Sequence, residues 1–150
     1  MPQSLIKLYI HIVFSTKNRE PLITPGIEEK LHRYLAGICH ELECHPVQIG
    51  GYTDHVHILC MLSKKITLMK LVEELKSHSS KWIKTQNAGL KNFYWQNGYG
   101  TFSVNPTEID RAQQYIENQH EHHKTTSFQD EYRAFLNKYK VAFDERYVWD

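Results

Sequence analysis

One stretch of the sequence decides how this chain folds: VQIGGYTDHVHILCML, residues 47–62. It predicts a short strand at 47–51, a turn within the Gly-Gly-Tyr-Thr-Asp segment at 50–54, and a second strand at 55–62. Two strands joined by so short a turn pair with each other as a β-hairpin. The other predicted elements are arranged on either side of this hairpin.

Two histidines, His55 and His57, share one face of the second strand. Side chains alternate along a strand, so residues two apart project together. Two neutral imidazoles at this spacing can bind one divalent cation, although histidines on a strand are more commonly partly exposed and bind no metal. The opposite, core face is filled by apolar residues, which are Val56, Ile58, Cys60 and Leu62.

A strand and a helix are predicted before the hairpin. Leu5 to Phe14 has large apolar side chains at every second position, which is typical of a strand with one face in the core. The apolar residues from Ile27 to about Glu43 follow helical spacing, and Pro46 ends that helix.

Four further elements are predicted after the hairpin. An amphipathic helix covers 67–85, a short strand covers 101–104, and two helices cover 105–123 and 127–139. The helix predicted at 105–123 has a clear start: Asn105 is the cap, a proline follows it, and a glutamate lies three residues after the cap.

The order strand, helix, strand, strand, helix, strand, followed by helices, is the split βαβ pattern of ferredoxin-like α+β domains. We therefore expect an antiparallel sheet with helices on one face and an open second face on which a site can form. No internal repeat and no long linker divides the chain, so residues 1–150 are predicted to form a single domain.

The composition indicates a globular protein. Hydrophobic residues make up 41% of the 150 residues and charged residues 23%, and no apolar run is long enough to suggest membrane association. The three cysteines are an odd number and no secretory leader is recognisable, which favours the reducing cytoplasm.

Positive charge is concentrated in one segment. Residues 64–91 contain seven lysines and two glutamates, a net charge of +5, whereas the segments before and after it are net negative. Lysines clustered on one element favour contact with a polyanion, although a lysine-rich helix is more often simply a solvated face. The lysines of the predicted helix are Lys70, Lys76, Lys81 and Lys84.

The helix predicted at 105–123 carries a row of polar residues. Tyr115, Gln119 and His123 are spaced four apart, which places them on one side of a helix. This tyrosine can be a functional group, or it can pack at the edge of the core with its hydroxyl in water.

Four motifs, taken in order along the chain, resemble the single-tyrosine insertion-sequence transposases of the HUH nuclease class. The resemblance covers nearly the whole chain. The motifs are HIVFSTKNR at 11–19, HVH at 55–57, FYWQNGYGTFSV at 93–104 and YIENQ at 115–119.

The resemblance implies a catalytic mechanism. Tyr115 would attack a phosphodiester of single-stranded DNA, giving a 5′-phosphotyrosine intermediate and a free 3′-hydroxyl that can later reverse the step without ATP. His55, His57 and Gln119 would hold Mg²⁺ or Mn²⁺, with His123 as a rival for the third position because imidazole is at least as good a ligand as an amide oxygen.

The resemblance also implies partners. Family members bind hairpin-forming DNA ends and form homodimers in which the active site can be shared between subunits. In this chain the phosphate donors toward a hairpin would be Lys70, Lys76, Lys81, Lys84, Ser77 and Ser80.

Three other functions stay open at this stage. A domesticated single-strand nickase that processes chromosomal repeats would share the same catalytic residues. A ferredoxin-like binder of single-stranded nucleic acid would need no catalysis, although no RNP1 pattern is present. A metal-dependent hydrolase would use a bound water and no tyrosine.

Overall fold

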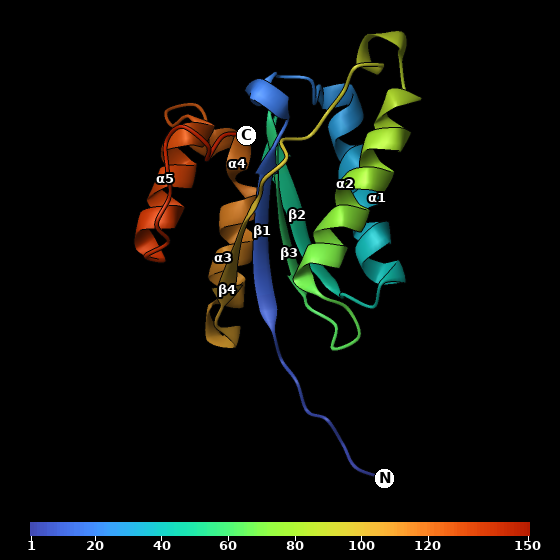
Figure 1. Cartoon of the computed structure of the whole chain (residues 1–150), viewed down its shortest axis with the longest axis vertical. Coiled ribbons are helices and arrows are strands. Elements are labelled where there is room, and N and C mark those ends of the chain that lie inside the picture. The colour runs from blue at the N-terminus through green and yellow to red at the C-terminus, as the bar shows by residue number, and fades with distance from the viewer.

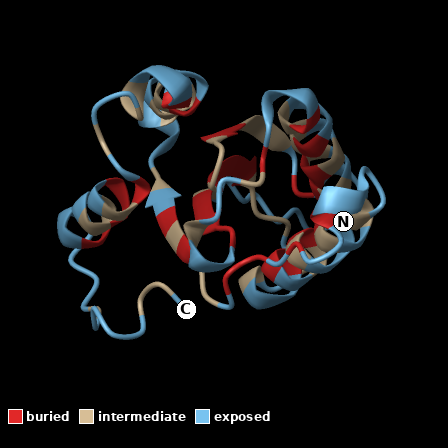
Figure 2. Cartoon of the chain, turned by 90° about the horizontal axis from the view of Figure 1, so that it is seen from above, coloured by how far each residue is buried: buried red, intermediate tan, exposed pale blue.

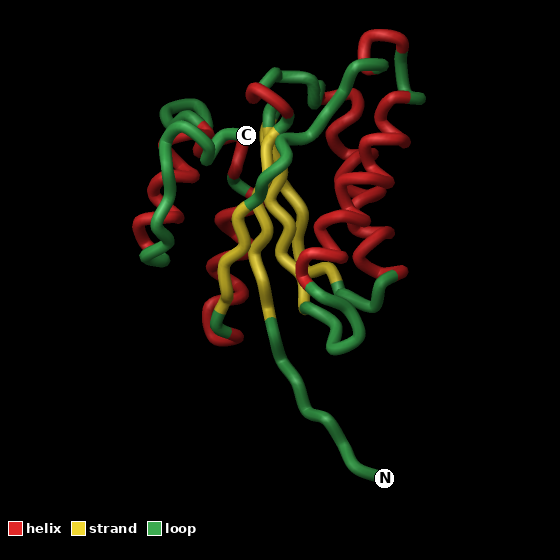
Figure 3. Tube along the Cα trace, viewed as in Figure 1, coloured by secondary structure: helices red, strands yellow, loops and turns green.

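The computed structural model describes all residues, 1–150, and is built on one four-stranded sheet. Its strands are β1 (Tyr9–Ser15), β2 (Pro46–Tyr52), β3 (His55–Met61) and β4 (Gly100–Val104). Their order in the sheet is β2-β3-β1-β4, and every neighbouring pair is antiparallel (Figure 3). This is the predicted ferredoxin-like α+β arrangement, so the fold prediction is confirmed.

Two helices, α1 (Pro25–Glu41) and α2 (Leu68–Lys84), cover one face of the sheet (Figure 1). The main hydrophobic core lies between them and the strands. The buried residues in Figure 2 follow the inner sides of these elements. The strand residues in this core are those that the alternation predicts, including Ile12, Phe14, Val56, Ile58 and Cys60.

The second face of the sheet carries the histidines, but it is not open as expected, because three further helices cover it. These are α3 (Ile109–Glu117), α4 (Gln119–His122) and α5 (Phe128–Lys138). Helices α3 and α4 pack on β2. Helix α5 packs on β1 and β4 through a separate cluster of Val13, Phe102, Phe128, Tyr132 and Leu136. None of the helices is both long and apolar enough to cross a membrane.

The first strand is shorter than predicted. It begins at Tyr9 rather than at Leu5, and Leu5 lies outside the core, with 86% of its surface exposed. Tyr9 pairs with Met61 and Val104, the last residues of the two neighbouring strands. Before Tyr9, the Leu8 carbonyl still accepts a hydrogen bond from the Leu62 amide at 2.7 Å, but no further strand pairing follows, and the N-terminal segment extends away from the sheet (Figure 1).

The long helix predicted at 105–123 is interrupted. A 3₁₀ turn at Pro106–Glu108 precedes α3, and Asn118 separates α3 from α4, with backbone angles of φ −94° and ψ 21°. Neither proline nor glycine occurs at or beside Asn118, so no residue type marks this break in advance. The predicted cap holds, because the Asn105 side chain accepts a hydrogen bond from the Thr107 amide at 3.0 Å.

Gly50 allows α3 to approach the sheet closely. A Cβ atom at this position would lie 2.4 Å from the carbonyl oxygen of Ile116. We expect Gly50→Ala to lower the free energy of unfolding by about 1–3 kcal/mol, because either the strand or α3 must move. Chemical denaturation measures this loss.

A matched control for Gly50→Ala is Gly37→Ala. Gly37 lies within α1, and an added Cβ would meet no atom within 4 Å. This change should raise the stability by about 0.5–1 kcal/mol, since alanine is the better helix residue. Equal effects of the two substitutions would contradict the close approach at Gly50.

Candidate active site

Three imidazoles meet between the sheet and the helices above it. His55 and His57 are fully buried on β3, on the face that the alternation predicts. His123 follows α4, and its ring centroid lies 4.6 Å from that of His55. The structure therefore places the two strand histidines beside the predicted rival ligand.

Each of these imidazoles is oriented by a contact at its Nδ1 atom. This leaves all three Nε2 atoms directed at a common centre, which is how metal-binding histidines are usually held. The partner atoms are Asp54 Oδ1 for His55 (2.7 Å), His11 Nε2 for His57 (2.7 Å) and the Thr126 carbonyl oxygen for His123 (2.6 Å).

The centre also contains a carboxylate that is not predicted from the sequence, Glu131 on α5. Its Oε1 atom lies 2.9 Å from Nε2 of His57 and 3.3 Å from Nε2 of both His55 and His123. Glu131 is only 3% exposed. The available signal was an acidic residue directly before Tyr132 on the apolar side of an amphipathic helix.

Gln119, the third ligand that the family resemblance implies, lies in the same cluster. Its Oε1 atom is 3.0 Å from Nε2 of His55 and 2.9 Å from Nε2 of His123. Its amide nitrogen donates to Oε2 of Glu131 at 3.0 Å. Both candidates for the third ligand position therefore reach the centre, and they contact each other.

The phenol of Tyr115 borders this cluster within the same chain. Its hydroxyl donates a hydrogen bond to Oε2 of Glu131 and lies 3.5 Å from Nε2 of His122. The Tyr115 and His57 rings are 5.9 Å apart between centroids. The tyrosine and the strand histidines, 58 positions apart in the sequence from His57 to Tyr115, are thus brought together by α3.

Electrostatic interactions in the cluster favour an ionised carboxylate and a protonated phenol. Burial opposes charge on Glu131, but the surrounding imidazoles hold its pKa well below the usual range. Burial also opposes charge on His55, yet hydrogen bonds to Asp54 and Glu131 raise its pKa to about 9. Burial, together with the Glu131 charge, raises the pKa of Tyr115 above its ordinary value.

The donor set fits a divalent cation. Neighbouring ligands around an ion with bonds of about 2.1 Å lie about 3 Å apart in octahedral geometry. The contacts among Glu131, Gln119 and the imidazoles are 2.9–3.3 Å, which matches this spacing. One ligand atom from each of His55, His57, His123 and Glu131 lies within 4.8 Å of the others.

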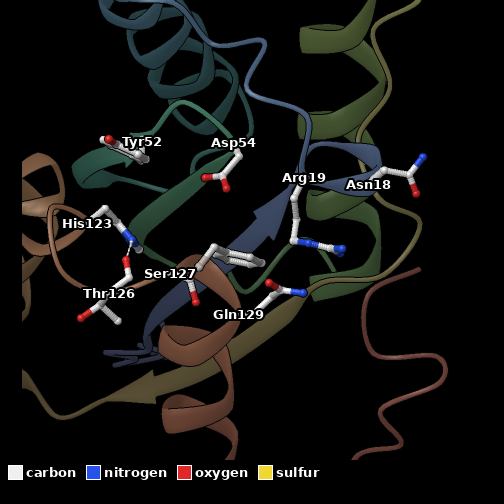
Figure 4. A pocket seen from close by; sticks show the side chains of 9 residues that line it. Asn18, Arg19, Tyr52, Asp54, His123, Thr126, Ser127 and Gln129 are labelled. Carbon is white, nitrogen blue, oxygen red and sulfur yellow. Dashed lines mark hydrogen bonds between the residues drawn. The ribbon is translucent and has the colours of Figure 1, made fainter.

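Two hollows adjoin the cluster. A groove of about 710 Å³ between α3 and α5 reaches Tyr115 and Glu131, and Arg111 and Lys138 also line it. A smaller polar cavity of about 350 Å³ includes Asp54, with Tyr52, His123 and Thr126 along one side and Asn18 and Arg19 along the other in the view of Figure 4. A substrate strand has space next to the phenol.

The predicted phosphate-binding helix, α2, lies on the opposite face of the sheet from α3, the helix that carries Tyr115 (Figure 1). Lys81 and Ser77 are exposed there. Lys70 pairs with Glu74 at 3.0 Å. Lys84 lies 3.2 Å from the Ser80 hydroxyl and 4.4 Å from the centre of the Tyr94 ring.

Lys76 differs from the other lysines of α2, because its ammonium group is engaged inside the protein. It donates to the carbonyl oxygens of Gln96 (2.7 Å), Asn97 (3.1 Å) and Gly98 (2.6 Å). Burial lowers its pKa to about 8, so it stays charged at neutral pH. Lys76 therefore anchors the loop before β4, and this position does not present a free ammonium to DNA.

We expect Lys76→Met to destabilise the protein by about 2–4 kcal/mol, because three carbonyl oxygens lose a charged donor. Thermal or chemical denaturation at pH 7 measures this. Lys81→Met on the exposed side of the same helix is the control and should change stability by less than about 0.5 kcal/mol. A Lys76→Met protein as stable as the control would contradict the anchoring role.

Fold and site together define a class of protein. A ferredoxin-like sheet that presents an HVH pair beneath a helix carrying Tyr115 is the arrangement of single-tyrosine transposases of the HUH class. The family described as "Transposase IS200 like" matches residues 4–119 of the chain. The chain belongs to this family.

Solved structures of two proteins share the fold. A candidate transposase from Deinococcus radiodurans is 23% identical, with a TM-score of 0.62 over 79% of this chain and 98% of that one. A REP-associated tyrosine transposase bound to a REP hairpin is 16% identical, with a TM-score of 0.60 over 82% of this chain and 73% of that one. Curated proteins give no significant match.

Proposed function

We propose that this transposase cleaves and rejoins single-stranded DNA at the ends of a mobile element, with Tyr115 as the nucleophile. The observation that carries the proposal is the contact of the Tyr115 phenol with the buried cluster that contains His55 and His57. We also propose that it acts in the cytoplasm, in keeping with its three free, buried cysteines.

In the proposed covalent step, one bond to the reacting phosphorus forms and another breaks. The Tyr115 oxygen forms a bond to phosphorus, the bond from phosphorus to the 3′-oxygen breaks, and that oxygen takes a proton and leaves as a 3′-hydroxyl. The phenolic proton is already directed at Oε2 of Glu131. A later attack by a 3′-hydroxyl on the phosphotyrosine reverses these bond changes and joins a strand.

A divalent cation, Mg²⁺ or Mn²⁺, would be held by His55, His57 and Gln119, with His123 as the rival third ligand. When bound, such an ion supplies a Lewis acid that withdraws charge from the phosphate. The chain's own contribution is orientation, because Asp54 and His11 fix the rings of the two strand histidines.

We propose a DNA hairpin as the partner of α2. A fold relative is described as bound to a REP hairpin, which supports this ligand. The donors available for its phosphates are Lys70, Lys81, Lys84, Ser77 and Ser80, whereas Lys76 is engaged with loop carbonyls. Because α2 and the Tyr115 helix, α3, lie on opposite faces, the hairpin and the cleaved strand would contact different sides of the sheet.

We keep the homodimer as a proposal. A site shared between two subunits is not needed to bring the tyrosine and the histidines together. Tyr115, Gln119 and His57 meet within one chain. We therefore propose that each chain assembles its own site.

One assay tests the proposed function. The protein is incubated with single-stranded DNA from the borders of its gene and with Mg²⁺ or Mn²⁺, and a denaturant-resistant protein–DNA adduct is sought. An adduct attached through Tyr115 supports the transposase, and it supports a nickase that processes chromosomal repeats equally well. Cleavage without an adduct supports a hydrolase, and binding without cleavage supports a nucleic-acid binder.

A further inference from the structure

Two members of the buried cluster lie beyond the part of the chain that the family match covers. The match ends at residue 119, whereas His123 follows α4 and Glu131 lies on α5. Glu131 nonetheless makes the shortest of its imidazole contacts with His57, at 2.9 Å. The segment after the family region therefore contributes to the centre of the site.

The atoms around Glu131 have the arrangement expected of ligands around a bound cation, with acceptor atoms directed at one point. A carbonyl oxygen only accepts, so His123 donates its Nδ1 proton to the Thr126 carbonyl, and its Nε2 then offers a lone pair. That lone pair faces Oε1 of Gln119 at 2.9 Å and Oε1 of Glu131 at 3.3 Å. With the His123 ring neutral, its Nε2 and these two oxygens are three acceptors around one point, which a metal ion there would satisfy.

His55 also faces this centre with its Nε2 atom. Its Nδ1 faces a carboxylate oxygen of Asp54 at 2.7 Å, while its Nε2 faces the oxygens of Gln119 at 3.0 Å and Glu131 at 3.3 Å. The two oxygens of Glu131 have different partners. Oε1 faces the imidazoles, whereas Oε2 accepts hydrogen bonds from Tyr115 and Gln119. One oxygen is therefore available to an ion while the other contacts the phenol.

We infer that Glu131 and His123 are ligands of the divalent ion, together with His55 and His57. The inference rests on the proposed function, since it concerns the ion proposed there, and it extends the site to a carboxylate on α5. Three imidazole nitrogens and one carboxylate suit Mn²⁺ and related transition ions better than Mg²⁺, which prefers oxygen ligands. The site should therefore discriminate between these two ions.

The test measures ion binding on the full-length protein without DNA. Titration calorimetry and the Mn²⁺ electron paramagnetic resonance signal give the affinities, and the visible spectrum of bound Co²⁺ reports the ligand set. Wild type should bind Mn²⁺ at least about tenfold more tightly than Mg²⁺. Glu131→Gln should weaken Mn²⁺ binding by about 100-fold or more, since even partners outside the ligand set cost roughly 10–100-fold.

Asp130→Asn is the matched control, because Asp130 is the exposed neighbour of Glu131 on the same helix. It should leave Mn²⁺ affinity and the Co²⁺ spectrum unchanged. If Glu131→Gln lowers the melting temperature, Glu131→Asp is used to test whether this carboxylate is a ligand. This variant keeps the charge but places the carboxylate one methylene further from the centre. A changed Co²⁺ spectrum in a folded Glu131→Asp protein supports the inference.

Two outcomes overturn the inference and separate it from the proposed function. If wild type binds Mn²⁺ and the folded Glu131 variants bind it with the same affinity and spectrum, Glu131 is not a ligand, while the tyrosine mechanism stands. If wild type binds no Mn²⁺ yet forms the Tyr115 adduct, the metal centre itself is refuted and the nucleophile remains. Equal affinity for Mg²⁺ and Mn²⁺ contradicts the nitrogen-rich ligand set.

Discussion

Tyr115→Phe is expected to abolish the covalent DNA adduct and to reduce strand cleavage by a factor on the order of 10⁴ or more, as loss of a catalytic nucleophile does in other covalent enzymes. The substitution removes one oxygen and keeps the ring, which packs 5.6 Å from Phe135 and 5.9 Å from His57 between centroids. The fold and the binding of Mn²⁺ should persist. Denaturing gels of labelled single-stranded DNA measure both adduct and cleavage.

The control for this substitution is Tyr147→Phe. Tyr147 is 63% exposed and lies outside both hollows next to the cluster. It should retain full adduct formation. Cleavage that survives in Tyr115→Phe would instead assign the reaction to a water nucleophile and thereby to a hydrolase.

His57→Ala is the second substitution for which we expect a large effect. His57 is fully buried, and its two ring nitrogens contact His11 and Glu131 at 2.7 and 2.9 Å. Its loss removes a proposed metal ligand and leaves Glu131 with less compensation for its charge. We expect Mn²⁺ affinity and cleavage each to fall by at least about 100-fold, more than loss of an outer partner costs. His40→Ala, at an exposed position of α1, is the control.

Mixing the two inactive variants tests whether the site is shared between subunits. A site assembled within one chain has no intact copy in a mixture of Tyr115→Phe and His57→Ala proteins. We therefore expect the mixture to stay inactive. Recovery of about a quarter or more of wild-type adduct would show that one subunit supplies the tyrosine and another the histidines, as in the predicted shared dimer site.

Local alternation explains why the sheet was predictable from sequence. Val56 and Ile58 lie in the main core, and His55 and His57 lie on the other face, because strand parity is fixed by the backbone. The four-residue spacing of Tyr115 and Gln119 likewise kept them adjacent despite the break at Asn118. These features depend only on near neighbours in the chain.

The roles of Glu131 and Lys76 were not predictable from such patterns. Glu131 reaches His57 across 74 positions, and only the packing of α5 on β1 and β4 places it there. Lys76 finds its carbonyl partners 20 to 22 residues away, in a loop without regular structure. The start of β1 at Tyr9 was also set by partner strands, because the residues before it continue the alternating pattern.

The two hydrophobic clusters of the molecule have different sizes, 18 buried residues between the sheet and α1 and α2 but only five beneath α5. Undocking α5 therefore disrupts a small share of the apolar packing and leaves the larger cluster intact. Proteins open in cooperative units, and a unit that buries little apolar surface opens at a low free-energy cost. Most of what holds α5 in place is therefore polar, because Glu131 must also leave three imidazoles, the Tyr115 phenol and the Gln119 amide when the helix undocks. The larger core between the sheet and α1 and α2 does not depend on these contacts.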